Sequence, residues 1–417
     1  MQKTEELAAA VRSLEQRQTG NNAEYSKSLE NLVGAFEQAL AYRAEPPGEK
    51  VLDQARRLAG VLESPSASCF QKLEQRARHR FTSRLYQAMT ERKKAFEHAA
   101  KYRELTPEKA PRKDQAEAWI FLAKACYWSD NQQCAVEYQR LALDLLDQAR
   151  ERGELSPEEE ESCNTAYTVW AFRYAQNTCD WAEAEQAFEF ALQRARKRDN
   201  PGLLSATLIL YAESKMFQGD WEACERLGAE CVQAALAAPG GPVSDYPFWI
   251  RGRALVHCNR SREALPELER AVSLARDIGD AVGLSEALIS RAEALVAVGR
   301  SDEALKLAAE AQYVAGYAGL VVNLAQVRVW RAWIEMEVDK ASAAGQLEPI
   351  HESLAVFERT GMRSGWACAL HALGHALALC GKNETARFYL ERAEKAFTEW
   401  DMPWHRERVE GSLKIIL

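Results

Sequence analysis

A pair of small residues recurs at a nearly constant interval through the second half of the chain. The first members of the first four pairs are 40 residues apart, and the last lies 82 residues beyond the fourth. The second member follows seven positions later, which is two helical turns along the same face. This spacing predicts repeated helix–helix contacts. The pairs are Ala184 and Ala191, Cys224 and Cys231, Ala264 and Ala271, Ala304 and Ala311, and Ala386 and Ala393.

Short polar breaks come just before most of these pairs. They are Gly219-Asp220, Asn259-Arg260, Gly299-Arg300 and Gly381-Lys382. Helices of fixed period that are joined by tight turns stack into a solenoid, which grows by adding units and needs no division into globular cores. The sequence therefore predicts an all-α solenoid of antiparallel helix pairs.

Two stretches carry a resemblance to a known repeat. They run from Trp119 to Ala142 and from Leu370 to Ala393, and they resemble the tetratricopeptide repeat. In the middle units, Ala212, Gly252 and Ala292 take the small site of the first helix. The interval is longer than the usual repeat of about 34 residues, which resembles the long-helix variety in the sensor arms of bacterial maltose-type activators. The resemblance implies a right-handed solenoid.

The stretch from Thr106 to Pro111 breaks the helical pattern, because proline cannot continue a helix. We expect an amino-terminal helical module over residues 1–112, and a solenoid of about seven helix pairs with a closing helix over 113–417. Apolar periodicity in the module predicts three helices, near residues 4–16, 25–43 and 50–62. The basic segment that follows, to about residue 105, predicts one long helix or two collinear ones.

Charge is distributed unevenly along the chain. The net charge is −8, yet residues 1–112 hold 20 Lys and Arg against 15 Asp and Glu. A basic segment joined to an acidic array could dock within the chain, on an acidic partner or on nucleic acid. A solvated helix of mixed charge is the plainer interpretation, and the overall pI of about 5.6 favours a protein partner.

Known catalytic and cofactor motifs find no match in the sequence. It lacks a phosphate-binding glycine loop, a nucleophile elbow and a CxxC pair. Cys368, His371 and His375 could share one helix face as zinc ligands, but no acidic fourth ligand or HExxH glutamate accompanies them. We therefore expect no enzyme, no cofactor and no metal.

The compartment follows from three further observations. The cysteines are scattered singly, as is usual for reduced thiols. No apolar run approaches the roughly 18 residues of a membrane helix, and residues 1–6 do not resemble a secretory signal. We expect a cytoplasmic protein without a membrane partner.

The resemblance also implies a binding surface, because the first helices of such repeats line the concave side. A groove with cations beside aromatic rings suits a peptide or protein segment, and an acidic or carboxylate-bearing one in particular. The candidate groove residues are Lys124, Trp128, Glu213, Trp249, Arg253, His257, Glu293, Trp333, His371 and His375.

We expect a protein- or peptide-binding adaptor or sensor, whose amino-terminal helices face an effector. The plan of a helical bundle before the repeats also resembles bacterial peptide-pheromone receptors. Two alternatives remain open at this point. One is a nucleic-acid-associated regulator that uses the basic helix, and the other is a detached sensor subunit of a larger effector complex.

Overall fold

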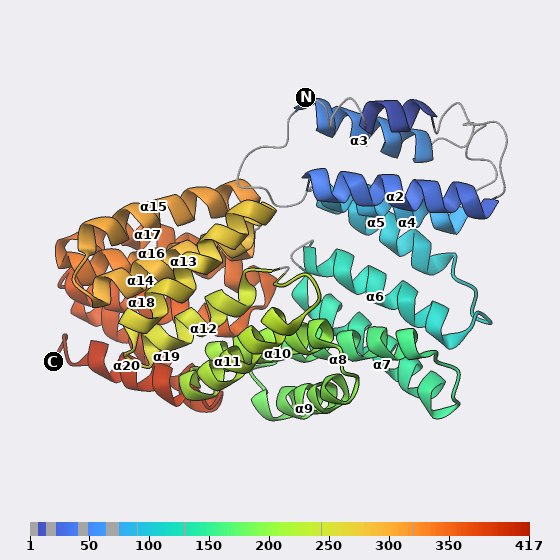
Figure 1. Cartoon of the computed structure of the whole chain (residues 1–417). Helices are drawn as coiled ribbons and strands as arrows, with labels where there is room; N and C mark the ends of the chain where they lie inside the picture. Colours follow the sequence, from blue (N-terminus) through green and yellow to red (C-terminus); the bar gives the residue numbers. More distant parts are fainter. Residues whose placement is uncertain are drawn as a thin grey trace. The chain divides into compact units, whose positions relative to one another are not determined.

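The structure is a computed structural model that describes residues 7–13, 22–40, 49–63, 75–89, 91–128, 131–242, 244–319 and 321–417. Every regular element in these ranges is a helix (Figure 1). The chain forms two compact units, Met1–Leu155 (unit 1) and Ser156–Leu417 (unit 2). The helix pair that follows residue 112 belongs to unit 1, so the boundary placed there stays a prediction about where the repeats begin.

Unit 1 has a helical segment over residues 7–13, followed by longer helices. Its first helices share one apolar core, which includes Val11, Leu29, Phe36, Leu58 and Phe81. The longer helices in the described part of unit 1 are α2 (Asn22–Leu40), α3 (Glu49–Glu63), α4 (Gln75–Ala88), α5 (Arg92–Glu104), α6 (Arg112–Trp128) and α7 (Gln132–Glu151).

Helices α4 and α5 form an antiparallel hairpin. The Ser83 hydroxyl donates a hydrogen bond to the Ala95 carbonyl at 2.7 Å, and His79 faces His98 with ring nitrogens 2.8 Å apart. The prediction of one long helix or two collinear helices was therefore wrong. Each half carries its own apolar stripe, and folding back lets α5 bury its stripe against neighbouring helices instead of leaving it in water.

In the described part of unit 2, twelve helices form six consecutive pairs and α20 follows them. Unit 2 is thus a solenoid of antiparallel helix pairs, as the sequence predicts. Its helices are α8 (Pro157–Thr178), α9 (Trp181–Lys197), α10 (Pro201–Gln218), α11 (Trp221–Ala237), α12 (Tyr246–His257), α13 (Ser261–Ile278), α14 (Ala281–Ala297), α15 (Ser301–Ala318), α16 (Val321–Val338), α17 (Ala343–Thr360), α18 (Arg363–Leu379), α19 (Asn383–Glu399) and α20 (Pro403–Leu413).

Polar residues at the breaks start these helices. Ser156 and Glu159 form a capping box at the start of α8, so the acidic run Glu158–Glu161 belongs to a helix start. The side chains of Asp180, Asp220 and Asp280 accept hydrogen bonds from backbone N–H groups in the first turns of α9, α11 and α14. The same turn chemistry therefore recurs along the array.

The small residues lie where helices cross. All ten members of the repeated pairs are buried, with at most 1% of their surface exposed. Gly252 and Gly374 show why size matters, since a Cβ on either would come within 2.6 and 2.7 Å of the Cγ atoms of Leu268 and Leu390. The predicted packing register is confirmed at these crossings.

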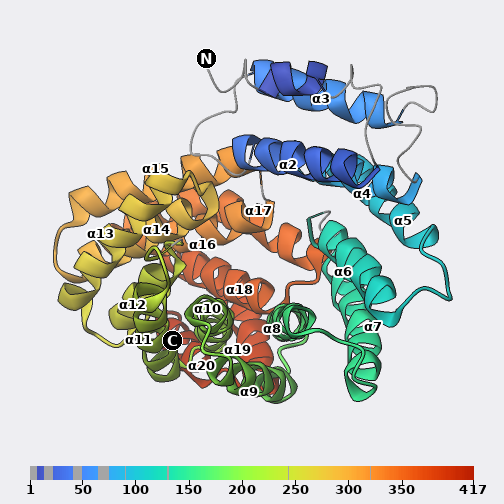
Figure 2. The ribbon, with the colours of Figure 1, turned by 45° about the vertical axis from the view of Figure 1, so that its right-hand side comes forward.

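Unit 2 closes on itself. The Trp181 indole N–H at the start of α9 donates to the Trp400 carbonyl at 2.7 Å, and Arg363 donates to the Thr178 carbonyl at 3.3 Å. These bonds join the first helix pair to the last, and α8 also packs against α18 (Figure 2). The first and last helix pairs of unit 2 are therefore in contact with each other.

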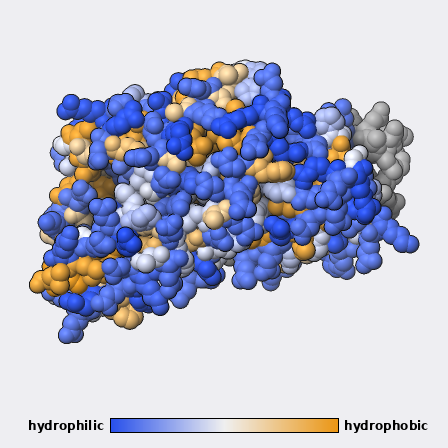
Figure 3. All heavy atoms as spheres, turned by 90° about the horizontal axis from the view of Figure 1, so that it is seen from below, coloured by the Kyte–Doolittle hydropathy of each residue, from blue (hydrophilic) through white to orange (hydrophobic). Residues whose placement is uncertain are grey.

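The surface is largely polar on the face seen in Figure 3, where hydrophobic residues form only scattered patches. Among the described residues, no helix combines the length and the apolar composition needed to cross a bilayer.

Candidate functional site

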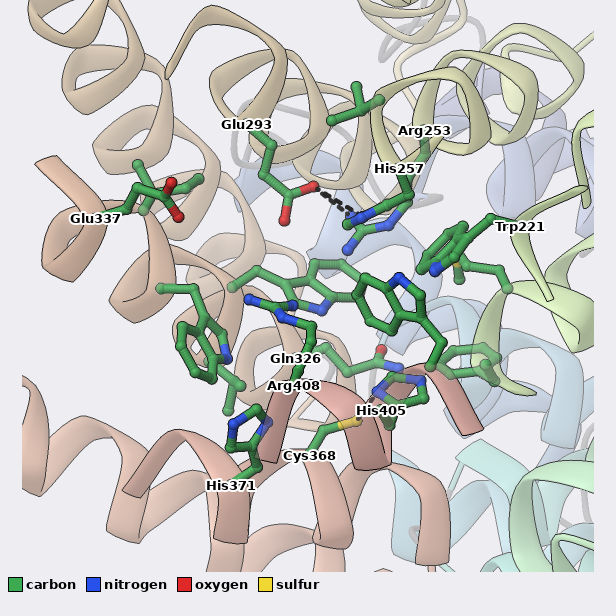
Figure 4. Close-up of a pocket in the computed structure, with 18 of the residues that line it drawn as sticks. Trp221, Arg253, His257, Glu293, Gln326, Glu337, Cys368, His371, His405 and Arg408 are labelled. Carbon is green, nitrogen blue, oxygen red and sulfur yellow. Dashed lines mark hydrogen bonds and ion pairs between the residues drawn. The ribbon is translucent and has the colours of Figure 1, made fainter. Parts of the chain in front are cut away.

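Unit 2 holds a cavity of about 260 Å³ in its interior (Figure 4). First helices of successive pairs provide most of the wall, and α20 provides Trp404, His405 and Arg408; Trp221 of α11 and Phe357 of α17 complete it. Most of the exposed lining is apolar, and four indole rings contribute to it. These belong to Trp221, Trp330, Trp333 and Trp404.

Arg253 enters the cavity from α12. Only 4% of its surface is exposed, its Nη1 donates to the Ser290 hydroxyl at 3.0 Å, and Glu293 Oε2 lies 3.5 Å away. The guanidinium carbon stands 4.0 Å from the Trp330 ring centroid, a cation–π contact. The buried Nε of Arg253 and the Oε2 of Glu293 make no hydrogen bond within the described residues. Donor and acceptor capacity therefore remains at the cavity wall.

His257 lies one turn further along α12, stacked on Trp221 with ring centroids 3.8 Å apart. Burial, followed by the nearby charge of Arg253, holds its pKa well below the usual value. The imidazole is therefore neutral at neutral pH, and it adds an aromatic face and a weak polar group to the wall.

Arg408 comes from α20 and faces the cavity from the opposite side (Figure 4). Its guanidinium carbon lies 4.7 Å from the Trp333 ring centroid and 4.9 Å from that of Trp404. Among the described residues, no carboxylate comes within 4.0 Å of this guanidinium and no hydrogen bond reaches its side chain. Arg408 is thus a partly buried cation held between two aromatic rings without an ion pair among the described residues.

Burial lowers the pKa of Arg408, although Glu293 and Glu337 act to raise it. The shift means that this environment, despite its acids, disfavours the charged form relative to water. Arginine nevertheless stays protonated in proteins, so Arg408 keeps its positive charge at the cavity wall although burial disfavours it.

The remaining histidines of the site are also uncharged at neutral pH. Burial lowers the pKa of His405 to about 3 and that of His375 to about 4, and it holds that of His371 well below its usual range. In each case the positive charge of Arg408 adds to the effect. The fixed charges around the cavity are therefore those of its arginines and glutamates.

His371 and His375 share a partner on α20. His371 Nε2 and His375 Nδ1 each lie 2.9 Å from the Ser412 hydroxyl oxygen. Across the described ranges, no group of three or more His, Cys, Asp and Glu side chains is arranged to hold a metal ion. The two histidines here link α18 to α20.

The ten predicted groove residues fall into three sets. Five line the cavity: Arg253, His257, Glu293, Trp333 and His371. Three are not in its lining: Glu213 and Trp249 are buried and His375 is partly buried. Lys124 and Trp128 lie on α6, in unit 1; Lys124 is exposed, and the side chain of Trp128 is outside the described residues.

The sequence analysis missed the residues that α20 supplies, Trp404, His405 and Arg408. Trp404 and Arg408 are four apart and therefore share one face of a short helix, which was the only available signal. The sequence predicts that this helix closes the array. Its repeat period does not indicate that the helix turns into the interior.

Comparison with solved structures connects this architecture to known proteins. Neither a protein-family model nor a curated protein matches the sequence. A Rap protein complexed with competence and sporulation factor superposes with a TM-score of 0.61 and 12% identity, covering 95% of this chain and 99% of that one. The apo form of the quorum sensor NprR from B. thuringiensis gives 0.52 and 13%, covering 89% and 99%.

The protein has a tetratricopeptide-like helical repeat fold. At identities this low the likeness establishes the fold alone. The cavity of this tetratricopeptide-like solenoid is lined mainly by first helices, as the resemblance implied. The long-repeat variety stays a prediction.

Proposed function

We propose that this protein is a non-enzymatic sensor or adaptor that binds a carboxylate-bearing peptide or protein segment in the cavity of unit 2. The observation that carries the proposal is Arg408, a partly buried guanidinium in the cavity wall without an ion pair among the described residues. A buried cation gains most from an anion that forms charge-assisted hydrogen bonds with it. Arg253, with its unsatisfied Nε, is the second donor.

The rest of the lining favours an amphipathic ligand. Four indole rings and mostly apolar walls suit an apolar side chain, while the arginines suit an anionic group. At about 260 Å³, the cavity is below the roughly 300–1,000 Å³ typical of pockets for drug-sized ligands. It would therefore receive one end of a peptide, with the remainder of the chain outside.

The comparisons support a sensor in the same sense. The Rap structure contains competence and sporulation factor, and NprR is described as a quorum sensor. Because the likeness extends to the fold only, ligand binding by this protein rests on its own cavity.

The thiol of Cys368, which lines the cavity, also favours binding over catalysis. Cys368 Sγ lies 3.9 Å from His405 Nδ1. Burial raises the pKa of the Cys368 thiol to about 12, and the thiolate is the reactive form. The thiol therefore stays protonated and unreactive at neutral pH.

We further propose that residues 1–112 form the effector-facing module. Nucleic acid is the weaker partner for it, because several basic side chains of α4 and α5 already have acidic partners. Arg84 pairs with Glu30 and Glu37, and Lys94 with Glu91. Solvated helices whose charged side chains are already paired suit contact with a protein surface.

The binding proposal is tested with a pool of five-residue peptides that end in free carboxylates, and with the same pool amidated. Peptides that co-elute with the protein are identified by mass spectrometry and titrated singly by tryptophan fluorescence. We expect retained peptides whose affinity falls about tenfold or more on amidation, as the loss of a charge-assisted contact predicts. Arg276→Met, on the exposed face of α13, is the control and should leave affinity unchanged. Retention of no peptide, or equal affinity for acid and amide, contradicts the proposal.

A further inference from the structure

We infer that α20 is a lid on the cavity, and that a bound carboxylate holds this lid in place. The inference rests on the proposed function, because it assigns the regulation of the same site. The inference goes beyond binding, because the docked position of α20 would depend on whether an anion contacts Arg408. We call Pro403–Leu413 the C-terminal lid.

The C-terminal lid covers one side of the cavity. The ring of Trp404 meets that of Trp221 edge-on at 5.2 Å, and His257 meets Trp404 at the same separation. The same three residues also line an outer hollow of about 690 Å³, so this aromatic wall separates the cavity from the surface. Moving the lid would remove Trp404 from the wall and connect the two spaces.

The fit of the lid against the solenoid is close at its first turn. Gly219, at the end of α10, has φ +86°, and a Cβ there would lie 3.1 Å from Trp404 Cβ and from His405 Cδ2. A close approach of this kind holds the lid in one position, yet it supplies little apolar area. The contact therefore sets the position in which the lid docks, and it contributes little to the stability of the docked lid.

Few side chains of the lid are fully buried, although the rings of Trp404 and His405 pack on Trp221 and Phe397. The helix has 11 residues, of which Val409 and Ser412 are buried. Isolated helices shorter than about 12–15 residues are marginal in water, so the lid is helical because it is docked. Met402 and Ile416, just outside its ends, add two buried apolar side chains. Polar contacts also keep the lid docked, through the hydrogen bonds between Ser412 and the two histidines of α18.

Arg408 opposes docking while its guanidinium lacks an anion. Docking removes this charge from water, and this burial lowers the pKa of Arg408 even though Glu293 and Glu337 favour the charged form; Arg253 acts against it. The contacts with Trp333 and Trp404 offset part of that cost. A ligand carboxylate would supply the missing partner, so ligand binding and lid docking must stabilise each other.

The test uses the full chain without ligand and measures hydrogen exchange of the lid amides by mass spectrometry. Arg408→Met keeps an apolar stem between the indole rings and removes the charge. We expect the lid amides of this variant to exchange about tenfold more slowly than those of the wild type, since replacing a buried ion by an apolar side chain often stabilises. Arg406→Met is the matched control, because Arg406 lies on the same helix, 46% exposed, and should change little.

Exchange in α18 and α19 reports on the rest of unit 2 in the same experiment. Faster or equal exchange in the Arg408→Met lid overturns the inference, as does loss of protection throughout unit 2, because either result makes Arg408 a stabilising residue. A carboxylate peptide that binds without slowing lid exchange in the wild type would overturn the lid and leave the binding proposal standing. If no peptide bound, the binding proposal would be wrong. The comparison of wild type and Arg408→Met without ligand does not test that proposal.

Discussion

Gly374 tests the packing of the array most sharply. In Gly374→Ala, the new Cβ would lie 2.7 Å from Leu390 Cγ, 2.8 Å from its Cδ2 and 3.1 Å from its backbone N. The last of these atoms moves only if α19 moves. Overpacking of this kind costs about 1–3 kcal/mol, while alanine in place of glycine within a helix returns about 1 kcal/mol. We expect a net loss of about 1 kcal/mol in the free energy of unfolding.

Gly316 provides the control, because it is exposed in the last turn of α15 and a Cβ there would meet nothing within 4 Å. Gly316→Ala should therefore stabilise by about 1 kcal/mol. Urea denaturation followed by circular dichroism measures both changes, and the midpoints should move in opposite directions. A Gly374→Ala variant as stable as Gly316→Ala would refute the helix crossing between α18 and α19.

Three other predictions concern the site and its surroundings. Burial raises the pKa of Glu213 to about 8, so below that pH the folded state keeps a proton that the unfolded state has lost. Glu213 alone should therefore lower stability by up to roughly 1.4 kcal/mol per pH unit as the pH rises toward 8, and in urea melts the stability of Glu213→Gln should fall less steeply with pH than that of the wild type. Arg253→Ala should weaken peptide binding by about 1–3 kcal/mol in fluorescence titrations. It should also lower the melting temperature, because Arg253 is buried and bonded to Ser290; an unchanged melting temperature would show that Arg253 does not contribute to packing. Chelation should leave the melting temperature unaltered because His371 and His375 bond the lid, and stoichiometric zinc by elemental analysis would contradict this.

The repeat could be predicted from the sequence because helix crossings impose local requirements. A crossing admits only small side chains, so Cys224 and Ala264 recur at a fixed interval, and a tight turn needs a capping residue such as Asp220. Each requirement involves residues close in the chain. The sequence pattern therefore carries them directly.

Features that depend on distant parts of the chain could not be predicted in the same way. Whether α20 meets α10 depends on small rotations that accumulate over five helix pairs, and no single repeat encodes them. For this reason Arg408 was missed, although Arg253 was found. The α4–α5 hairpin was missed because its two apolar stripes, taken alone, also fit a continuous helix.

The most direct test of the account pairs Arg408 with the ligand carboxylate in a double-mutant cycle. Affinities are measured for the wild type and for Arg408→Met, each with one retained peptide in its free-acid and amidated forms. We expect a coupling free energy of about 1.5–3 kcal/mol between Arg408 and the carboxylate, which is the range for hydrogen bonds to charged groups. Amidation should then weaken binding to the wild type and have little effect on the variant. A coupling near zero would show that Arg408 does not bind the carboxylate and would contradict the central claim.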